Sequence, residues 1–231
     1  MRWIIRNDVT HRVHPAWFGL TGVTVRPASE TLQREVQLRA GELQTCYRDP
    51  ASALPAFTPA RRMYHACGID PSKTRPSSEA LVRRILQGKG LYQVNTAVDA
   101  ANLASITIFR SIGLYDADQI VPEPPSGSGD DGPAATLAAG VVRLRAGRAG
   151  EQYPGIGKEM IHLEGRPAMI DAAGPFGNPS ADSDRTKVTL ETRRLLFVLF
   201  EPVGEDPAEV EKRLETCRRI LLRHVGGEVE T

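Results

Sequence analysis

The sequence predicts a mixed α/β (α+β) fold, in which a mixed sheet flanked by helices forms a single compact domain over residues 1–231. The length of 231 residues suits one large domain or two small ones. Short apolar runs of strand length interleave irregularly with segments of helical period. The continuous apolar run LLFVLF (residues 195–200) is typical of a central strand that is buried on both faces. We expect an N-terminal strand–helix portion at 1–74, a core region at 75–202 and a C-terminal helix at 203–231.

The first portion contains two short apolar runs, at residues 3–5 and 20–25, which predict strands. A helix follows them. Ser29 is a natural N-cap for it, because its hydroxyl can accept a hydrogen bond from a free amide of the first turn. Three prolines between residues 50 and 59 then predict a loop.

The core region opens with a second helix near Ser77, with Glu79 close to the positive end of its dipole. The apolar stripe of this helix leaves Arg83 and Arg84 facing outward. LYQV (residues 91–94) predicts a short strand, and Thr96 with Asp99 resembles a capping box for a third helix. The breaker-rich stretch PEPPSGSGDDGPAA (residues 122–135) predicts a flexible loop. Further strands are predicted at GVVRL, MIHL and PAMIDAA.

The C-terminal helix has the clearest boundaries. Asp206 is its expected cap, Pro207 suits its first position, and Gly226 follows its last turn. Its inward stripe is predicted to consist of Val210, Leu214, Cys217 and Leu221.

Composition narrows the possible functions. Hydrophobic residues make up 41% of the chain and charged residues 25%, close to globular averages. With a net charge of +1, contact with a nucleic acid requires a local basic patch, and we expect no DNA partner. Three widely separated cysteines fit a reducing compartment. Because no apolar run has the length of a signal peptide or a membrane span, we expect a soluble cytoplasmic protein without a membrane partner.

Motifs for a bound cofactor or metal are incomplete. PGIGKE (residues 154–159) has the Gly-Lys pair of a phosphate loop, but it lacks the first glycine and the following Ser or Thr. His11 and His14 have no further ligands at metal-binding spacing. We therefore expect no cofactor and no metal site.

Two polar stretches remain as candidates for a site. Asn95, Asp99 and Asn102 lie at a predicted strand-to-helix junction, where backbone amides favour ligands. The structural alternative is that Asn95 satisfies loop backbone and Asp99 only caps the helix. DAAGPFGNPSADSDRT (residues 171–186) predicts a tight, irregular, polar loop that could form the wall of a pocket. Arg185 could clamp a carboxylate or phosphate there, or it could pair with an aspartate to rigidify the loop.

These stretches carry a family resemblance. PSSEALVRRILQGKGLYQVNTAVDAANLASI followed by GLYDADQI resembles the B3/B4 editing module of the bacterial phenylalanyl-tRNA synthetase beta subunit. Asn95, Asp99 and Asn102 match the family's Asn-rich junction. DAAGPFGNP resembles its glycine-rich loop, and VTLET followed by LLFVLFEP resembles its final segment. The resemblance covers roughly residues 75–202, and the GNPxxDSxRTxVT pattern is similar to that of free-standing members of the family.

The resemblance implies a trans-editing deacylase that hydrolyses a misacylated aminoacyl-tRNA ester. An activated ester needs only a positioned water, an oxyanion donor and the terminal RNA hydroxyl. On this reading, the residues expected to carry catalysis are Asn95 and Asn102 (water or substrate positioning), Asp182 (the ammonium), and Ser183 or Thr186 (the oxyanion). Those expected to bind substrate are Asn178, Gly174, Gly177 and Arg185 (the terminal phosphate), with Arg83 and Arg84 on the RNA backbone.

Two departures from the family pattern favour a second reading. The family's histidine is replaced around Gly113 and Leu114, and its acidic residue falls near Pro179. The alternative is therefore a non-catalytic module that binds RNA or a small amino-acid-like molecule. Under either reading the expected partner is the tRNA acceptor end or a small amino-acid-like ligand. Arginine pairs gathered on the pocket rim would favour RNA, and scattered pairs would favour the small ligand.

Overall fold

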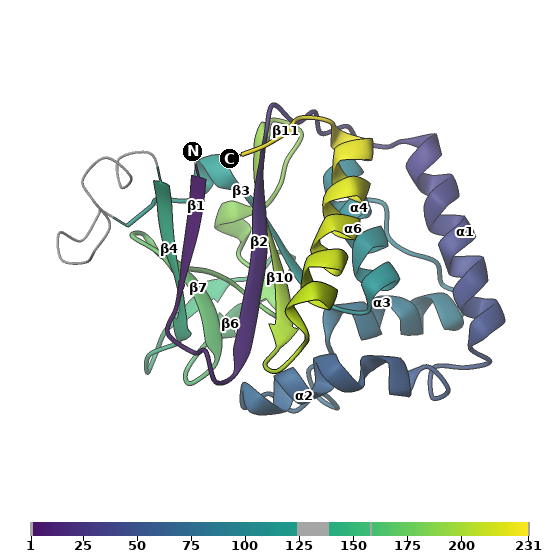
Figure 1. Ribbon diagram of the computed structural model, residues 1–231, viewed down its shortest axis with the longest axis horizontal. Coiled ribbons are helices and arrows are strands. Elements are labelled where there is room, and N and C mark those ends of the chain that lie inside the picture. The colour runs from purple at the N-terminus through teal and green to yellow at the C-terminus, as the bar shows by residue number, and fades with distance from the viewer. Residues whose placement is uncertain (1, 124–138, 158, 231) are drawn as a thin grey trace.

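A four-stranded antiparallel sheet forms the middle layer of the molecule (Figure 1). The computed structural model describes residues 2–123, 139–157 and 159–230. The strand order is β11 (Glu228–Val229), β2 (Val13–Thr21), β10 (Arg194–Pro202) and β3 (Ser111–Asp116). β10 contains the apolar run LLFVLF and pairs with β2 on one side and β3 on the other. The predicted central buried strand is confirmed.

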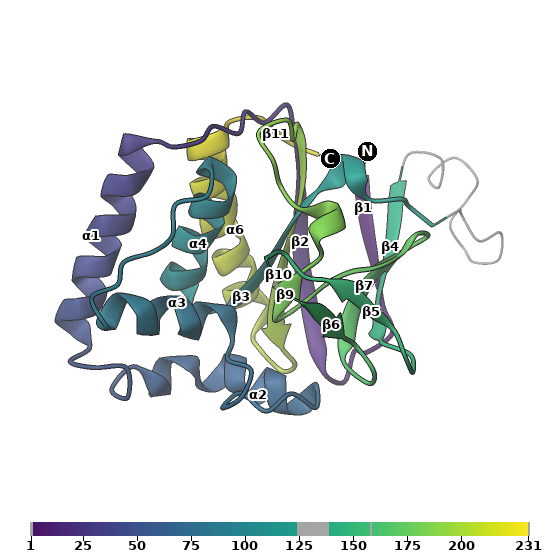
Figure 2. The ribbon, with the colours of Figure 1, turned by 180° about the vertical axis from the view of Figure 1, so that it is seen from behind.

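Alternation along β10 divides the core in two, because successive side chains of a strand point to opposite faces. Leu195, Phe197 and Leu199 pack with the helices. Leu196, Val198 and Phe200 pack against a second sheet. The result is three layers, with helices on one face of the middle sheet and the second sheet on the other (Figures 1 and 2).

The second sheet is mixed. Its order is β1 (Arg2–Asn7), β4 (Ala139–Ala146), β7 (Pro167–Asp171), β8 (Gly174–Asn178) and β9 (Ala181–Asp182). β1 and β4 run parallel, and the other pairs are antiparallel. β5 (Gln152–Pro154) and β6 (Met160–His162) form a separate antiparallel pair. The predicted fold, a single compact α/β domain with a mixed sheet flanked by helices, is confirmed.

The described part of the chain contains five α-helices. These are α1 (Glu30–Cys46), α2 (Thr58–Ala66), α3 (Ser77–Leu86), α4 (Thr96–Ile108) and α6 (Pro207–Val225). Four of them form the helical layer, whereas α2 buries Met63 and Tyr64 in the core on the other face of the middle sheet. Short 3₁₀ turns occur at η1 (Leu54–Phe57), η2 (Ala117–Gln119) and η3 (Asp184–Thr186). No helix among the described residues is long and apolar enough to cross a membrane.

Two predicted helix boundaries are confirmed by their caps. The Ser29 hydroxyl accepts from the Leu32 amide, and the Asp206 carboxylate accepts from the Ala208 amide. Gly226 ends α6 with a φ of 65°, which glycine adopts without strain. The predicted inward stripe of α6 is buried in full.

Three local predictions were wrong. The proline-containing region forms η1 and α2, because Pro55 and Pro59 stand in first turns, where a missing amide is not needed. Residues 91–94 form no strand, and they leave Tyr92 and Val94 more than half exposed. The second strand ends at Thr21 and does not extend to residue 25.

The stretch at residues 171–186 was predicted to be an irregular loop, and the structure corrects this. Most of it belongs to the β7–β8–β9 meander, followed by η3. The glycines that suggested a loop, Gly174 and Gly177, lie in β8. A Cβ on Gly177 would lie 2.3 Å from the Tyr115 hydroxyl oxygen, so the side chain is missing where the phenol packs. In the predicted breaker-rich loop, residues 124–135 lie outside the described residues.

Candidate functional site

A cavity of about 360 Å³ lies where α3 and α4 face β3 and β9, and we call it the interface cavity. These elements neighbour one another in Figure 2. Leu81 and Val98 supply apolar surface from the helices, and Leu114 and Val188 supply it from the opposite side. The polar lining residues are Ser77, Asn102, Ser105, Ser180, Asp182 and Lys187. Apolar walls with a few polar groups are the usual composition of a small-molecule pocket.

Asp182 supplies the carboxylate of the interface cavity. Its Oδ2 accepts a long hydrogen bond of 3.4 Å from the Leu114 amide. Two buried phenols, Tyr115 and Tyr153, lie close to it. Burial raises the pKa of both phenols, and the Asp182 charge raises it further. Both hydroxyls therefore stay protonated, and the Tyr153 hydroxyl donates to the Ala181 carbonyl at 2.5 Å.

Asn102 lines the interface cavity from α4. Its side chain is half-buried and borders the interface cavity as well as a second, smaller cavity. Within the described ranges, the Asn102 side chain has no hydrogen-bond partner. Its amide is thus available to a ligand in either cavity.

Asn95 has a structural position. It is the N-cap of α4, where its Oδ1 accepts from the Ala97 and Val98 amides at 3.1 and 3.0 Å. Its Nδ2 donates to the Val188 carbonyl at 3.3 Å. The predicted capping box at Thr96 is one residue out of place, because Thr96 lies inside the helix and its hydroxyl accepts from the Arg26 amide. The junction joins an exposed loop to a helix and not a strand to a helix.

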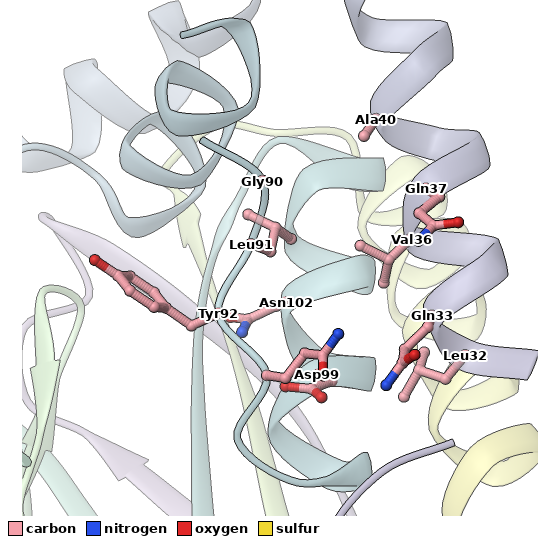
Figure 3. Close-up of a pocket in the computed structure, with 11 residues that line it drawn as sticks. Leu32, Gln33, Val36, Gln37, Ala40, Gly90, Leu91, Tyr92, Asp99 and Asn102 are labelled. Carbon is pink, nitrogen blue, oxygen red and sulfur yellow. The ribbon is translucent and has the colours of Figure 1, made fainter. Parts of the chain in front are cut away.

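Asp99 lies in the second cavity. This cavity has a volume of about 170 Å³ between α1, residues 90–93 and α4, and we call it the α1 cavity (Figure 3). The Asp99 Oδ1 accepts from the Val94 amide at 3.0 Å. Burial raises the pKa of Asp99, and this hydrogen bond lowers it by a smaller amount.

Three other predicted site residues of the 171–186 stretch form hydrogen bonds with backbone groups. The Ser183 hydroxyl accepts from the Arg185 amide, and the Thr186 hydroxyl donates to the Phe176 carbonyl. The Asn178 Oδ1 accepts from the Ser180 and Ala181 amides. None of Ser183, Thr186 and Asn178 lines the interface cavity.

Arg185 is committed to an ion pair, which was one of the two alternatives for it. Its guanidinium binds both oxygens of the buried Asp171 at 2.9 and 3.0 Å, and it also donates to the Gln119 carbonyl. Gly174 has a φ of 119° at the start of β8, which is a backbone requirement. Gly174, Gly177 and Arg185 do not line the interface cavity either.

The arginine pairs of the sequence, at residues 61–62, 83–84, 193–194 and 218–219, lie on different elements and form separate contacts. Arg84 stacks on the Tyr92 ring at 3.8 Å from its centroid and donates to its hydroxyl. Other contacts of the pairs include Arg61 with Glu79, Arg62 with Glu205, Arg194 with Glu230, and Arg218 with Glu215. The basic residue in the lining of the interface cavity is Lys187, which pairs with Asp184 at 3.0 Å. By the criterion set from the sequence, this scatter favours a small ligand.

Two residues at the expected departures from the family pattern line the interface cavity. They are Leu114 and Pro179, whereas Gly113 does not line it. Sequence reasoning missed Tyr115, whose ring fits beside Gly113 and Gly177. The signal was Gly113 directly before Leu114-Tyr115 in a buried strand, which marks a close approach of another group.

Comparisons with a family model and with known proteins agree on one family. The model of the B3/4 domain matches residues 59–221, a wider span than the 75–202 expected from the motifs. The phenylalanine–tRNA ligase beta subunit of Bartonella henselae is 24% identical over 91% of this chain and 27% of its own length. The same subunit of Bartonella quintana is 28% identical over 62% of this chain and 19% of its own. The chain spans about a quarter or less of these relatives.

A solved structure shows a weaker likeness. It is an N-terminal fragment of the phenylalanyl-tRNA synthetase beta subunit from Pyrococcus horikoshii, with a TM-score of 0.48 and 16% identity over 99% of this chain and 50% of that one. The family assignment depends on the sequence match, which covers well over half of the chain. The chain belongs to the B3/4 domain family.

Proposed function

We propose that this protein hydrolyses the ester bond of a misacylated aminoacyl-tRNA in trans, with the amino acid held in the interface cavity. The observation that supports this most is that Asp182 and Asn102 line one cavity with apolar walls. The names of the curated relatives, which are tRNA ligase subunits, supply the tRNA part of the proposal.

The lining matches an amino acid that has an apolar side chain. The ammonium group binds Asp182, and the side chain packs among Leu81, Val98 and Leu114. A volume of about 360 Å³ is near the lower end of the range for ligand pockets, about 300–1,000 Å³. The amino acid therefore enters the cavity, and the terminal nucleotide remains at its mouth near Lys187.

The reaction needs little from side chains, because the ester is already activated. Water attacks the carbonyl carbon, the bond between that carbon and the ribose oxygen breaks, and the ribose oxygen takes a proton as it leaves as a hydroxyl. The Asn102 amide donates a hydrogen bond to the developing oxyanion. We assign this donor to Asn102 and not to Ser183 or Thr186, since those hydroxyls contact backbone outside the cavity.

The test is a deacylation screen. Purified protein is incubated with tRNAs charged with a panel of correct and incorrect amino acids, and loss of each ester is compared with protein-free buffer. We expect selective loss of one or a few esters of apolar amino acids. Asn102→Ala should slow the reaction by about 100-fold, the usual effect of removing an oxyanion donor. The matched control is Thr107→Ala on the same helix, whose hydroxyl contacts only the Leu103 carbonyl in the described structure.

A second candidate function is non-catalytic binding of the same amino acid or a similar small molecule. Leu114 and Pro179 favour it, because the cavity lacks the family's histidine and acid at these positions. The scattered arginines favour it too. If no ester is lost above background, deacylation is excluded. Saturable binding of a free apolar amino acid would then support this candidate.

A further inference from the structure

The α1 cavity contains a carboxylate that neither the fold nor the proposed function requires to be charged. Its polar lining includes Gln33 and Gln37 from α1, Gln93 from the loop, and Asp99 and Asn102 from α4. Figure 3 shows Asp99 in the middle of this space, with Gln33 across from it. Val36 and Leu32 add apolar surface on the α1 side.

Asp99 is only 8% exposed, so its charge is largely removed from water. The Val94 amide satisfies one of its oxygens. In the described part of the chain, the other oxygen has no hydrogen-bond partner, and no Lys, Arg or His lines the cavity. A buried carboxylate without a partner is costly, so such a group is paired, binds a ligand or takes up a proton.

The position of Asp99 explains its charge only in part. Asp99 lies in the first turn of α4, where the helix dipole gives a carboxylate a small favourable contribution. Its contact with the Val94 amide requires an acceptor oxygen, which an asparagine side chain also has. Among the described residues, the buried acids Glu79 and Asp171 have the arginine partners Arg61 and Arg185. The buried Asp116 has no arginine partner there, but both of its oxygens accept hydrogen bonds, from the Thr192 hydroxyl and the Asp118 amide. The α1 cavity instead surrounds its acid with neutral amides, which can accept N–H groups through their carbonyl oxygens.

We propose that the α1 cavity binds a small ammonium-bearing molecule, whose N–H groups donate to Asp99 and to the surrounding amide oxygens. The ammonium supplies the missing positive charge. The remaining carbons of the ligand pack on Leu32 and Val36. At about 170 Å³ the cavity is smaller than the usual ligand pocket, so the ligand has only a few heavy atoms. A single carboxylate is too few ligands for a metal, and the described residues contain no group of three potential metal ligands.

The probe for this site is n-butylammonium, measured by titration calorimetry at pH 7 with the full chain. Its uncharged counterpart, 1-butanol, has a similar size and shape. We expect saturable binding of the amine and binding of the alcohol at least about tenfold weaker, the scale of a charge-assisted hydrogen bond. Equal binding of the two probes would overturn the proposed ammonium specificity, and so would no binding of the amine.

Two variants assign the site. Asp99→Asn keeps an acceptor for the Val94 amide and removes the charge, so it should fold and bind the amine at least about tenfold more weakly. Ala40→Leu keeps the charge and fills the cavity, and it should also abolish binding. The control is Glu211→Gln, an exposed acid on α6 that should bind as the wild type does. Unchanged binding by Asp99→Asn would contradict the proposal. No tRNA enters this experiment, so its outcome is independent of the proposed hydrolysis.

Discussion

Two regions of the molecule differ in whether their buried acids are paired with arginines. Near the N-terminal end of α6, Glu201 is fully buried and binds Arg110 at 2.7 Å and Arg213 at 2.6 Å. Glu205 contacts both arginines. We call these four residues the salt-bridge corner. In the α1 cavity, Asp99 is buried beside neutral amides and empty volume. The corner has its charges balanced within the protein and so is structural. The cavity leaves a charge to be balanced from outside, which marks a binding site.

The largest effect is expected from breaking the salt-bridge corner. Glu201→Gln keeps the shape of the side chain but leaves Arg110 and Arg213 to share Glu205 alone. We expect a loss of about 3 kcal/mol in the free energy of unfolding, because removing one member of a buried pair leaves an uncompensated charge. Urea denaturation measures this as a lower midpoint at unchanged slope. A midpoint equal to that of the wild type would refute the structural role of the corner.

The sheet that contains β8 and the helix α1 should also differ in how they tolerate an added methyl group. At Gly177 in β8, a Cβ would collide with the Tyr115 hydroxyl at 2.3 Å. Gly177→Ala should cost about 2 kcal/mol through overpacking. Gly41 lies within α1 with nothing in reach of a Cβ, so Gly41→Ala should stabilise the protein by up to about 1 kcal/mol. Thermal unfolding of the two variants checks the opposite signs, and equal shifts would contradict the rigid packing at Tyr115.

The ion pair between Arg185 and the buried Asp171 should also stabilise the fold, as the salt-bridge corner does. Arg185→Ala removes two hydrogen bonds to the buried Asp171, which keeps its contacts with the Val121 and Ala173 amides. We expect a loss of about 1.5 kcal/mol in the free energy of unfolding. Arg185→Lys should recover less than half of it, because an ammonium cannot form the bidentate contact. Full recovery by lysine would mean that only the charge matters.

The smallest effect is expected for Asp99→Asn without ligand. Burial raises the pKa of Asp99 above its unfolded value of about 3.9. The folded state therefore binds the proton more tightly, and this stabilisation is lost as pH rises through the folded pKa. At pH 7 the buried Asp99 carboxylate lowers the free energy of unfolding of the wild type, so the variant should have the higher urea midpoint. The part of the difference that comes from this charge should shrink as pH falls through the folded pKa, and it should be lost below the unfolded pKa of about 3.9. A difference that stays constant from pH 7 to pH 3 would contradict the account.

Local signals predicted the elements whose boundaries depend on neighbouring residues in sequence. Ser29 and Asp206 begin helices and Gly226 ends one, each through contacts within one turn, so the sequence was sufficient to predict these boundaries. LYQV failed for a different reason. Its residues have strand propensity, but none of the described strands pairs with them, and pairing is decided by tertiary structure. The meander of β8 and β9 was missed because its glycines permit both a loop and the close packing of Tyr115.

The site was predictable in part. Asn102 and Asp182 were named from their polar setting, and the structure brings them to one cavity. Asn95, Ser183 and Arg185 have the same residue types, yet each is engaged by backbone or by an ion pair. Sequence cannot separate the two groups, because the difference lies in which partners the fold supplies.

The most direct test of the central claim, that the interface cavity holds the amino acid of a tRNA ester, is the single-turnover hydrolysis rate of the Asp182→Asn variant. The substrate is the ester that the wild type removes fastest, and the control is Glu211→Gln, which makes the same change of charge on an exposed side chain. We predict that Asp182→Asn loses about 100-fold or more in rate at subsaturating protein, because the ammonium loses its counter-charge. We predict that Glu211→Gln keeps the wild-type rate. A wild-type rate for Asp182→Asn would contradict the claim.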